Sequence, residues 1–515
     1  MHVEKIIRAL RRIAAPSDNG SVLSAALLAL LLGGVIAGCG SAAKATDDDD
    51  EYVEVEYEGD EIVIERMPEE DEVDDDLFDP LSSSATEIPE DIEEFEVDGL
   101  TVIHRPTGSS FHTVFAKLYI RGGLPAIPAG VSPAIEQLAL DVPRFSGPAS
   151  MGRAAYLRER DRLYIGLGAT AERDFSTLSL KSTDENFDRG WEIFTGLVLD
   201  PGFDATAMTN ITERAVIGVR NRRVVPEAYA DYLADSVFFY GHPYGRVAEE
   251  ADYATITERD LRDYHKTLFV KSRLFLVVVG NVTKQEITEK VRATLGKLPE
   301  GSYKEPKIAV PVNAGKSALI VRAPWGREDI PTNYLVVRHL APGYGEPLFY
   351  AMHRLNSFIG GFLFRKIRID RNLSYAPGAD VYDHRLGFGD ISISTVLPDS
   401  AWRVTRDEII DFFRENIIDE KYLKDVPATW FTSEYMNKQT AEAQANEIGN
   451  AWFYTGDWRE AFRTLEHEAN VSPDEMNEAA FRYLDDFTFI VVGDPKAVDA
   501  GEYVEAVEEP SGSEE

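Results

Sequence analysis

The run LFLVVVGN at residues 274–281 decides the fold, together with a second run, FTFIVVGD, at residues 487–494. Each is a continuous apolar stretch that stops at Gly-Asn or Gly-Asp, which is typical of a strand buried on both faces. A helix with acidic residues in its first turn is expected before each strand, starting near Thr257 and near Ser472. Gly280 and Gly493 are 213 residues apart, so the repeat has the size of a domain.

The surrounding patterns predict more strands and helices in both copies. In the first copy we expect strands at 100–105, 114–121 and 163–170, and helices at 133–142, 187–199 and 204–222. In the second we expect strands at 318–322, 334–338 and 390–396, and helices at 348–369, 404–416 and 433–454. Because these elements do not alternate strictly, the predicted fold class is α+β: two tandem homologous domains, each a β-sheet covered by helices. The domains span 96–300 and 316–495, with a linker at 301–315.

The charge of the chain is concentrated outside these domains. The 515 residues carry a net charge of −36, and residues 41–100 alone hold 26 acidic and two basic groups. Such acidic blocks predict a disordered tether at 40–95, and residues 496–515 form an acidic tail. The hydrophobic content of 44% is ample for a core. Nucleic acid is excluded as a partner, because its recognition requires a basic surface.

The N-terminus has the order of an export signal. Four basic residues precede an apolar run at 22–36, and small residues follow. The run ends Ile36-Ala37-Gly38-Cys39, which resembles a bacterial lipoprotein box and implies a signal peptide at 1–39 and acylation of Cys39. A plain signal peptide or a transmembrane helix is the alternative. Cys39 is the single cysteine, so an intramolecular disulfide is excluded. Because Gly40 stands where an inner-membrane lipoprotein often has Asp, we expect a lipid-anchored protein of the outer membrane that faces the periplasm.

Six short motifs, in order, resemble the insulinase/pitrilysin family of zinc metallopeptidases, which are of the inverzincin type. In the first half they are VDGLTV at 97–102, LDPGF at 199–203, GHPYG at 241–245 and VVVGN at 277–281. In the second half, FRKIR at 364–368 and NLSY at 372–375 resemble the family's Arg…Gly-Leu-Ala-Tyr signature. The resemblance covers about residues 96–495.

That resemblance implies a zinc motif, which is degenerate here. The family binds zinc through the two histidines of H-x-x-E-H, and the glutamate acts as general base. The matching positions hold Pro133, Glu136 and Gln137, and the third ligand position holds Arg220, or Glu213 if the alignment shifts by one turn. Neither Pro133 nor a cationic Arg220 can replace a zinc ligand. We therefore expect no cofactor in this chain, and a peptidase-like protein that is inactive alone.

A structural explanation also accounts for this segment. Ser132 would cap the helix, Pro133 would occupy its first turn, and Glu136 would lie near the positive end of the helix dipole. A different metal site is not indicated, because none of the nine histidines has another at a spacing of three or four residues. His104 and His112 flank an expected hairpin, which could bring them face to face, but strand histidines are more often surface residues.

The second half keeps the pair that the family uses to hold substrate. The resemblance implies that Arg368 and Tyr375 hydrogen-bond a backbone carbonyl of the peptide. Without that resemblance, an ion pair between Arg368 and Asp370 and a packed Tyr375 would be the simpler interpretation. The leading hypothesis is a non-catalytic subunit of a heterodimeric zinc peptidase, which binds unfolded peptides for a zinc-bearing partner of the same family. The alternative is a pseudo-peptidase lipoprotein that serves as a peptide-binding or structural scaffold.

Overall fold

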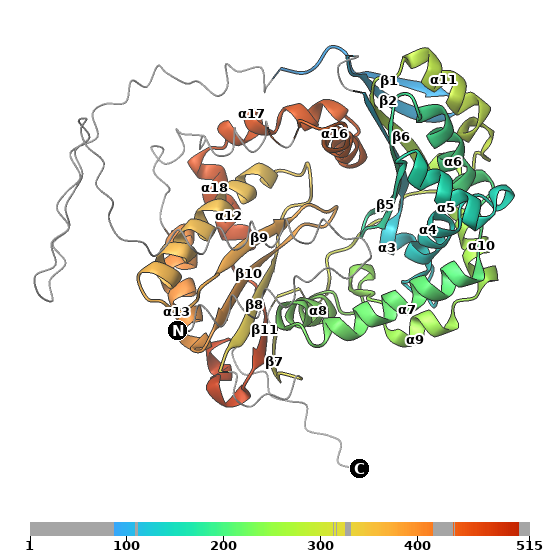
Figure 1. Ribbon diagram of the computed structural model, residues 1–515. Coiled ribbons are helices and arrows are strands. Elements are labelled where there is room, and N and C mark those ends of the chain that lie inside the picture. The colour runs from blue at the N-terminus through green and yellow to red at the C-terminus, as the bar shows by residue number, and fades with distance from the viewer. Residues whose placement is uncertain are drawn as a thin grey trace, which may run out of the picture. The chain divides into compact units, whose positions relative to one another are not determined.

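The computed structural model describes residues 87–108, 112–312, 314–315, 317–324, 331–415, 436 and 438–503, and all of them lie in one compact unit, Asp76–Glu515 (Figure 1). The signal peptide, Cys39 and most of the predicted tether lie outside the described residues. Within the part of the chain that is described, two mixed sheets carry helices on their faces, which confirms the α+β prediction.

The first sheet has six strands in the order β1-β2-β6-β3-β5-β4. Their bounds are Glu93–Val97, Leu100–Pro106, Thr113–Arg121, Gly166–Ala171, Phe175–Thr183 and Leu274–Gly280 for β1 to β6. The apolar strand β6 lies between β2, to which it is parallel, and β3, to which it is antiparallel. All seven residues of β6 are buried, as its continuous apolar sequence requires.

The second sheet repeats this arrangement with five strands in the order β7-β11-β8-β10-β9. The bounds are Ser317–Arg322, Asn333–Leu340, Gly378–Tyr382, Phe388–Thr395 and Thr488–Gly493 for β7 to β11. Strand β11 takes the place of β6, because it is parallel to β7 and antiparallel to β8. The helices before β6 and β11 both start with a capping box, at Thr257 and at Ser472. The two halves therefore share one topology.

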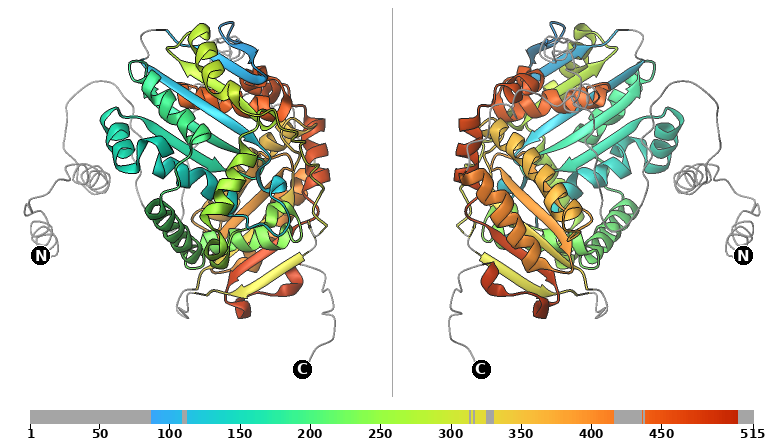
Figure 2. Two further views of the ribbon diagram at one scale, coloured as in Figure 1. Left: turned by 90° about the vertical axis from the view of Figure 1, so that its right-hand side faces the viewer. Right: turned by 90° about the vertical axis from the view of Figure 1, so that its left-hand side faces the viewer.

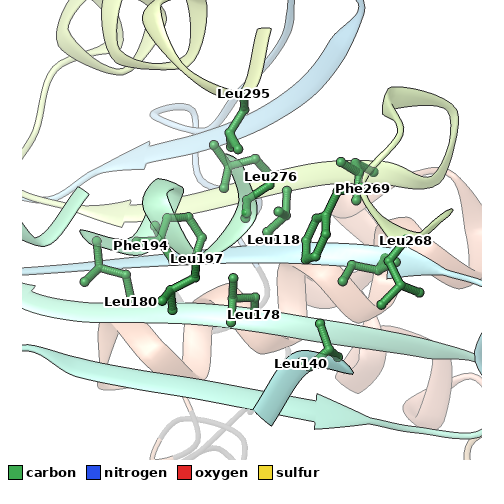
Figure 3. Close-up of a cluster of buried hydrophobic side chains, with 14 of the residues drawn as sticks. Leu118, Leu140, Leu178, Leu180, Phe194, Leu197, Leu268, Phe269, Leu276 and Leu295 are labelled. Atoms are coloured by element: carbon green, nitrogen blue, oxygen red, sulfur yellow. The ribbon is translucent and has the colours of Figure 1, made fainter. Parts of the chain in front are cut away.

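Helices cover the outer face of each sheet. The first half contains α3 Gly123–Ala126, α4 Ile135–Ser146, α5 Arg153–Arg162, α6 Phe187–Leu199, α7 Ala205–Arg222, α8 Pro226–Phe238, α9 Glu250–Thr255, α10 Glu258–Leu268 and α11 Lys284–Ala293. Helices α4, α6, α10 and α11 pack on the first sheet, where Leu118 and Leu276 meet Leu140, Phe194 and Leu268 in one apolar cluster (Figure 3). This cluster is the largest core of the first half and fixes the orientation of α4.

The second half is covered in the same way. It contains α12 Phe349–Leu363, α13 Pro398–Thr405, α14 Asp411–Glu415, α16 Ala441–Thr455, α17 Thr464–Ala469 and α18 Pro473–Tyr483. Two π-helical turns, Phe364–Ile369 and Arg406–Ile410, extend α12 and α13. Residues from α12, α13, α14 and α18 form a core with Val337, Ile391 and Val491 of the sheet.

The remaining face of each sheet is covered by a helix from the other half. Helix α16 packs Ala445 and Ile448 against Phe275 and Val277 of the first sheet. Helix α8 packs Ala230 and Ala234 against the second sheet. Figures 1 and 2 show α16 beside β6 and α8 beside β11. Because α16 of the second half covers the first sheet and α8 of the first half covers the second sheet, the two halves share apolar cores.

Two terminal segments differ from the sequence prediction. Strand β1 begins at Glu93, inside the segment 40–95 that was assigned to the tether. At the other end, the described part of the predicted acidic tail packs on the second half, where the Tyr503 side chain is buried beside the ring of Phe489. Glu502 lies within ion-pair distance of Arg403 and Arg406. Tyr503 and Glu502 thus hold the chain beyond β11 against the second half.

Candidate functional site

Helix α4 carries the residues that match the zinc motif, but it starts later than predicted. Its first residue is Ile135 and its N-cap is Ala134, so Pro133 precedes the helix. The Ser132 hydroxyl accepts a hydrogen bond from the backbone N–H of Ala134 at 3.1 Å and does not cap the helix itself. The prediction that Ser132 caps the helix is therefore wrong, because the N-cap lies two residues later, at Ala134. Glu136 does lie in the first turn, as expected.

The Glu136 carboxyl group is enclosed by protein. Its side chain is 1% exposed, and it accepts hydrogen bonds from the Ser176 hydroxyl at 2.5 Å and from the Tyr264 hydroxyl at 2.6 Å. Burial raises the pKa of this carboxyl, and the nearby Arg273 guanidinium and the two hydrogen bonds only partly offset that effect. Both carboxyl oxygens therefore already have donors within the fold, and Glu136 ties α4 to β5 and α10.

Gln137 is used structurally as well. Its Nε2 donates to Asp141 at 2.7 Å, and its Oε1 accepts from the backbone N–H of Ala171, the last residue of β4, at 2.8 Å. A zinc site needs three or four free donor atoms, whereas Pro133 has no side-chain donor and both polar ends of Gln137 are taken. The residues on α4 do not fit the zinc ion of the related peptidases. Among the described residues, no three His, Cys, Asp or Glu side chains are placed to hold a metal ion.

The other predicted positions lie elsewhere on the first half. Arg220 is exposed near the end of α7 and pairs with Glu250 of α9 at 2.8 Å, while Glu213 is exposed on the same helix. The expected hairpin with His104 and His112 does not form, because β6 lies between β2 and β3. His104 is buried and contacts the carbonyl of Val282, whereas His112 is exposed and pairs with Asp184. The structure does not bring these residues together.

Arg368 and Tyr375 do meet, although seven residues separate them. The guanidinium carbon of Arg368 lies 4.1 Å from the centre of the Tyr375 ring and 5.0 Å from that of Phe364. Asn372 makes the turn between them with φ of 49°, in the left-handed region. Asn tolerates this conformation better than most residues, which explains why it replaces the glycine of the family signature.

This pair keeps its hydrogen-bond donors available. The Tyr375 side chain is 77% exposed. Among the described residues, no carboxylate pairs with Arg368 and no hydrogen bond is made by the Tyr375 hydroxyl, so the predicted alternative of an Arg368–Asp370 ion pair is not formed. A stacked guanidinium leaves its N–H edge free to bind an acceptor. The geometry suits a ligand that offers an oxygen atom, such as a peptide carbonyl.

Sequence reasoning missed a buried ion network that joins the two halves. Arg338 of β8, which is 3% exposed, donates to Asp390 at 2.7 Å and to Asp235 of α8 at 2.5 Å. Arg173, which precedes β5, donates to Asp235 at 2.7 and 2.8 Å. The spacing of Ala230, Ala234 and Phe238 after Pro226 could have indicated α8, but nothing local identifies Arg338 as its partner.

A second buried carboxylate joins the halves beside this network. Asp174 accepts hydrogen bonds from the Tyr244 hydroxyl, from the backbone N–H of Arg385 at 2.9 Å and from the Tyr454 hydroxyl at 3.3 Å. Burial alone would raise the pKa of Asp174, but hydrogen bonds from His384, Tyr244 and the Arg385 amide outweigh it, so the pKa lies below its usual value. Donors from both halves thus bind the same buried carboxylate.

Comparison with known sequences finds one matching family model and one curated relative. Residues 255–440 match the family described as the peptidase M16 inactive domain, and this segment contains Arg368 and Tyr375. This segment of the chain therefore resembles the M16 peptidases. This confirms the predicted resemblance to the insulinase/pitrilysin family. Over 201 residues the chain is 23% identical to the probable mitochondrial-processing peptidase subunit beta of Arabidopsis thaliana, an alignment that spans 38% of this chain and 37% of that relative.

Solved structures agree with the fold. The peptidase M16 inactive domain from Pseudomonas fluorescens aligns with a TM-score of 0.69 and 16% identity, over 78% of this chain and 97% of that one. The periplasmic protease PqqL from Escherichia coli aligns with a TM-score of 0.67 and 14% identity, over 79% of this chain but only 46% of PqqL. The chain thus spans less than half of PqqL. In the described ranges, no helix is both long and apolar enough to cross a membrane.

Proposed function

We propose that this chain is the non-catalytic subunit of a two-chain zinc metallopeptidase, in which it binds an unfolded peptide for a partner subunit of the same family. The observation that carries the proposal is the stacked pair of Arg368 and Tyr375, for which the described part of the chain supplies no carboxylate to Arg368 and no hydrogen-bond partner to the Tyr375 hydroxyl. The engaged side chains of Glu136 and Gln137 on α4 support the absence of hydrolysis by this chain alone.

The two side chains would act on the peptide backbone. The guanidinium of Arg368 and the hydroxyl of Tyr375 are both donors, and together they can hold one carbonyl oxygen in a fixed orientation. Stacking of the two groups limits their rotation, so less conformational freedom is lost when the peptide binds. The partner would supply the zinc ion and the general base, because no residue of α4 can do so here.

Location in the cell envelope fits this role. The N-terminal pattern ending in Cys39 resembles a lipoprotein signal, and the structural neighbour PqqL is a periplasmic protease. We place the chain in the bacterial envelope, anchored by acylated Cys39 to the outer membrane and facing the periplasm. The acidic segment that follows Cys39 would keep the folded domains away from anionic lipid by charge repulsion.

The second candidate function is a scaffold that binds peptides and never takes part in their hydrolysis. The engaged side chains of Glu136 and Gln137 on α4 are equally compatible with this alternative. The two functions differ in one outcome, which is cleavage of peptide by a complex that contains this chain.

The test compares variants of the chain in binding and in cleavage. Binding of a fluorescein-labelled unfolded peptide is measured by anisotropy for the wild type, Arg368→Ala, Tyr375→Phe and the control Arg158→Ala, which changes an exposed arginine of α5. We expect about fivefold to tenfold weaker binding for the first two variants and no change for the control. Cleavage by the complex with a co-expressed H-x-x-E-H homologue should fall in parallel.

Two results would speak against the proposal in different ways. Unchanged binding in both Arg368→Ala and Tyr375→Phe rejects the role given to this pair. Normal binding with no cleavage in any reconstituted complex rejects the heterodimeric peptidase and leaves the scaffold.

A further inference from the structure

Arg368 lies in a π-helical turn. The turn spans Phe364–Ile369 and continues α12, and the backbone N–H of Asp370 still bonds to the carbonyl of Arg365 at 2.9 Å. π-helical turns are rare and occur often at functional sites. In this turn Phe364, Arg365 and Ile369 are exposed and Arg368 is partly exposed, and the Arg368 guanidinium lies over the Tyr375 ring.

The turn is strongly basic in a chain that is otherwise acidic. Arg365, Lys366, Arg368 and Arg371 lie within seven residues, while the whole chain carries −36. Glu408 on the second π-helical turn reaches Lys366 at 3.5 Å and Arg371 at 2.6 Å. Counting Glu408 and Asp370 against the four cations leaves this basic turn with a charge of +2. Among the described residues, no carboxylate pairs with Arg365 or Arg368.

Apolar side chains are exposed at the same place. The Phe364, Ile369 and Tyr375 side chains are 47%, 62% and 77% exposed. Free guanidinium groups beside exposed rings are complementary to a ligand that carries carboxylates next to apolar groups. A peptide with acidic and apolar side chains has both features, and a neutral polar peptide has neither.

We infer that the basic turn makes this chain selective for acidic peptides, with Arg365 binding a carboxylate side chain close to the carbonyl that Arg368 and Tyr375 hold. This rests on the proposed function and adds a substrate class to it. Arg365 is the specificity residue because its planar fork can bind a carboxylate through two parallel hydrogen bonds, and Arg368 is already stacked between rings. The chain as a whole carries a net charge of −36, so attraction of acidic peptides would have to come from this local group of basic residues.

The experiment uses three fluorescein-labelled peptides of equal length that differ only in having Glu, Gln or Lys at the same positions. Their dissociation constants are measured by anisotropy with the wild type, Arg365→Gln and the control Arg158→Gln, at low and at high salt. We expect the Glu peptide to bind about fivefold more tightly than the Gln peptide at low salt, and this gap to shrink at high salt. Arg365→Gln should abolish the gap while leaving the Gln peptide unchanged, and Arg158→Gln should alter neither.

The outcomes separate the inference from the proposed function. Equal affinities for the three peptides, or a gap that survives Arg365→Gln, overturn the inference, and the proposed function still stands if Arg368→Ala weakens all three peptides. Failure of the wild type to bind any of them overturns both. Vesicles containing an anionic phospholipid are measured alongside: binding that Arg365→Gln abolishes, with no preference among the peptides, would assign the basic turn to a membrane surface instead.

Discussion

The carboxyl group of Glu136 receives hydroxyl hydrogen bonds from Ser176 and Tyr264, residues that are 40 and 128 positions away in the chain. It therefore joins a helix, a strand and a second helix, at a position where related enzymes need a general base. Burial favours the protonated form of this carboxyl and raises its pKa, although Arg273 and the two hydroxyl donors partly oppose that effect. The position has a structural role, and its titration is open to measurement.

Replacement of Glu136 by Gln should change how stability depends on pH. Burial raises the pKa of Glu136 in the folded chain, so above about pH 4.3, the ordinary Glu pKa, the folded state binds more protons than the unfolded state. The contribution of Glu136 to the free energy of unfolding then falls as the pH rises. Since Gln does not ionise, Glu136→Gln should gain stability relative to the wild type as the pH rises above about 4.3 towards neutrality.

Urea unfolding at several pH values measures this difference. The control is Glu185→Gln, which changes an exposed carboxylate and should leave the pH dependence as it is. A difference between Glu136→Gln and the wild type that stays constant over this range would show that the carboxyl is not shifted upward in the folded chain.

Candidate site positions could be named from the sequence, whereas the contacts around them could not. Pro133 and Gln137 could be identified because they stand at the two histidine positions of the zinc motif. A proline ring has no atom that can bind zinc in place of an imidazole. The stacking of Arg368 on Tyr375 could not be predicted, since it depends on a π-helical turn and on the left-handed turn at Asn372. The hydrogen-bond partners of Glu136 could not be predicted either, because they come from elements that are distant in the sequence.

At the scale of elements, strands β6 and β11 were predicted because a run of apolar residues needs cover on both faces. Helix α8 was missed, and α16 was expected without its partner, because the sheet that each one covers belongs to the other half. Local periodicity shows that a helix has an apolar face, but not which sheet that face meets. The exchange of helices is therefore a tertiary feature.

The contact between α16 and the first sheet depends on one glycine. A Cβ at Gly449 would overlap the ring of Tyr119, whose hydroxyl donates to Asn450 at 3.2 Å. Gly449→Ala should push α16 away from β3 and lower the free energy of unfolding by about 1–3 kcal/mol. The matched control is Gly361→Ala in α12, where a Cβ meets open space, and this change should raise the free energy by up to about 1 kcal/mol.

Both variants are compared with the wild type by urea unfolding at one pH. Equal effects of the two substitutions would contradict the account, because helix propensity alone would then explain them and the contact with Tyr119 would be unimportant.

At the scale of the whole molecule, the two halves behave as one folded body. They share apolar cores through α8 and α16, and Arg338 is paired with both Asp235 and Asp390. Separation of the halves would part Arg338 from Asp235 and leave a buried charge without that partner. The halves are therefore not expected to separate easily. The exposed Arg368–Tyr375 pair is then free to face a second protein.

The central claim is that this chain binds peptide without metal and does not cut it. The most direct measurement incubates the purified chain with a labelled unfolded peptide, with zinc or with EDTA, and follows anisotropy and peptide mass in the same sample. The account predicts equal binding in both conditions and intact peptide throughout. Cleavage by the lone chain that EDTA abolishes would contradict it.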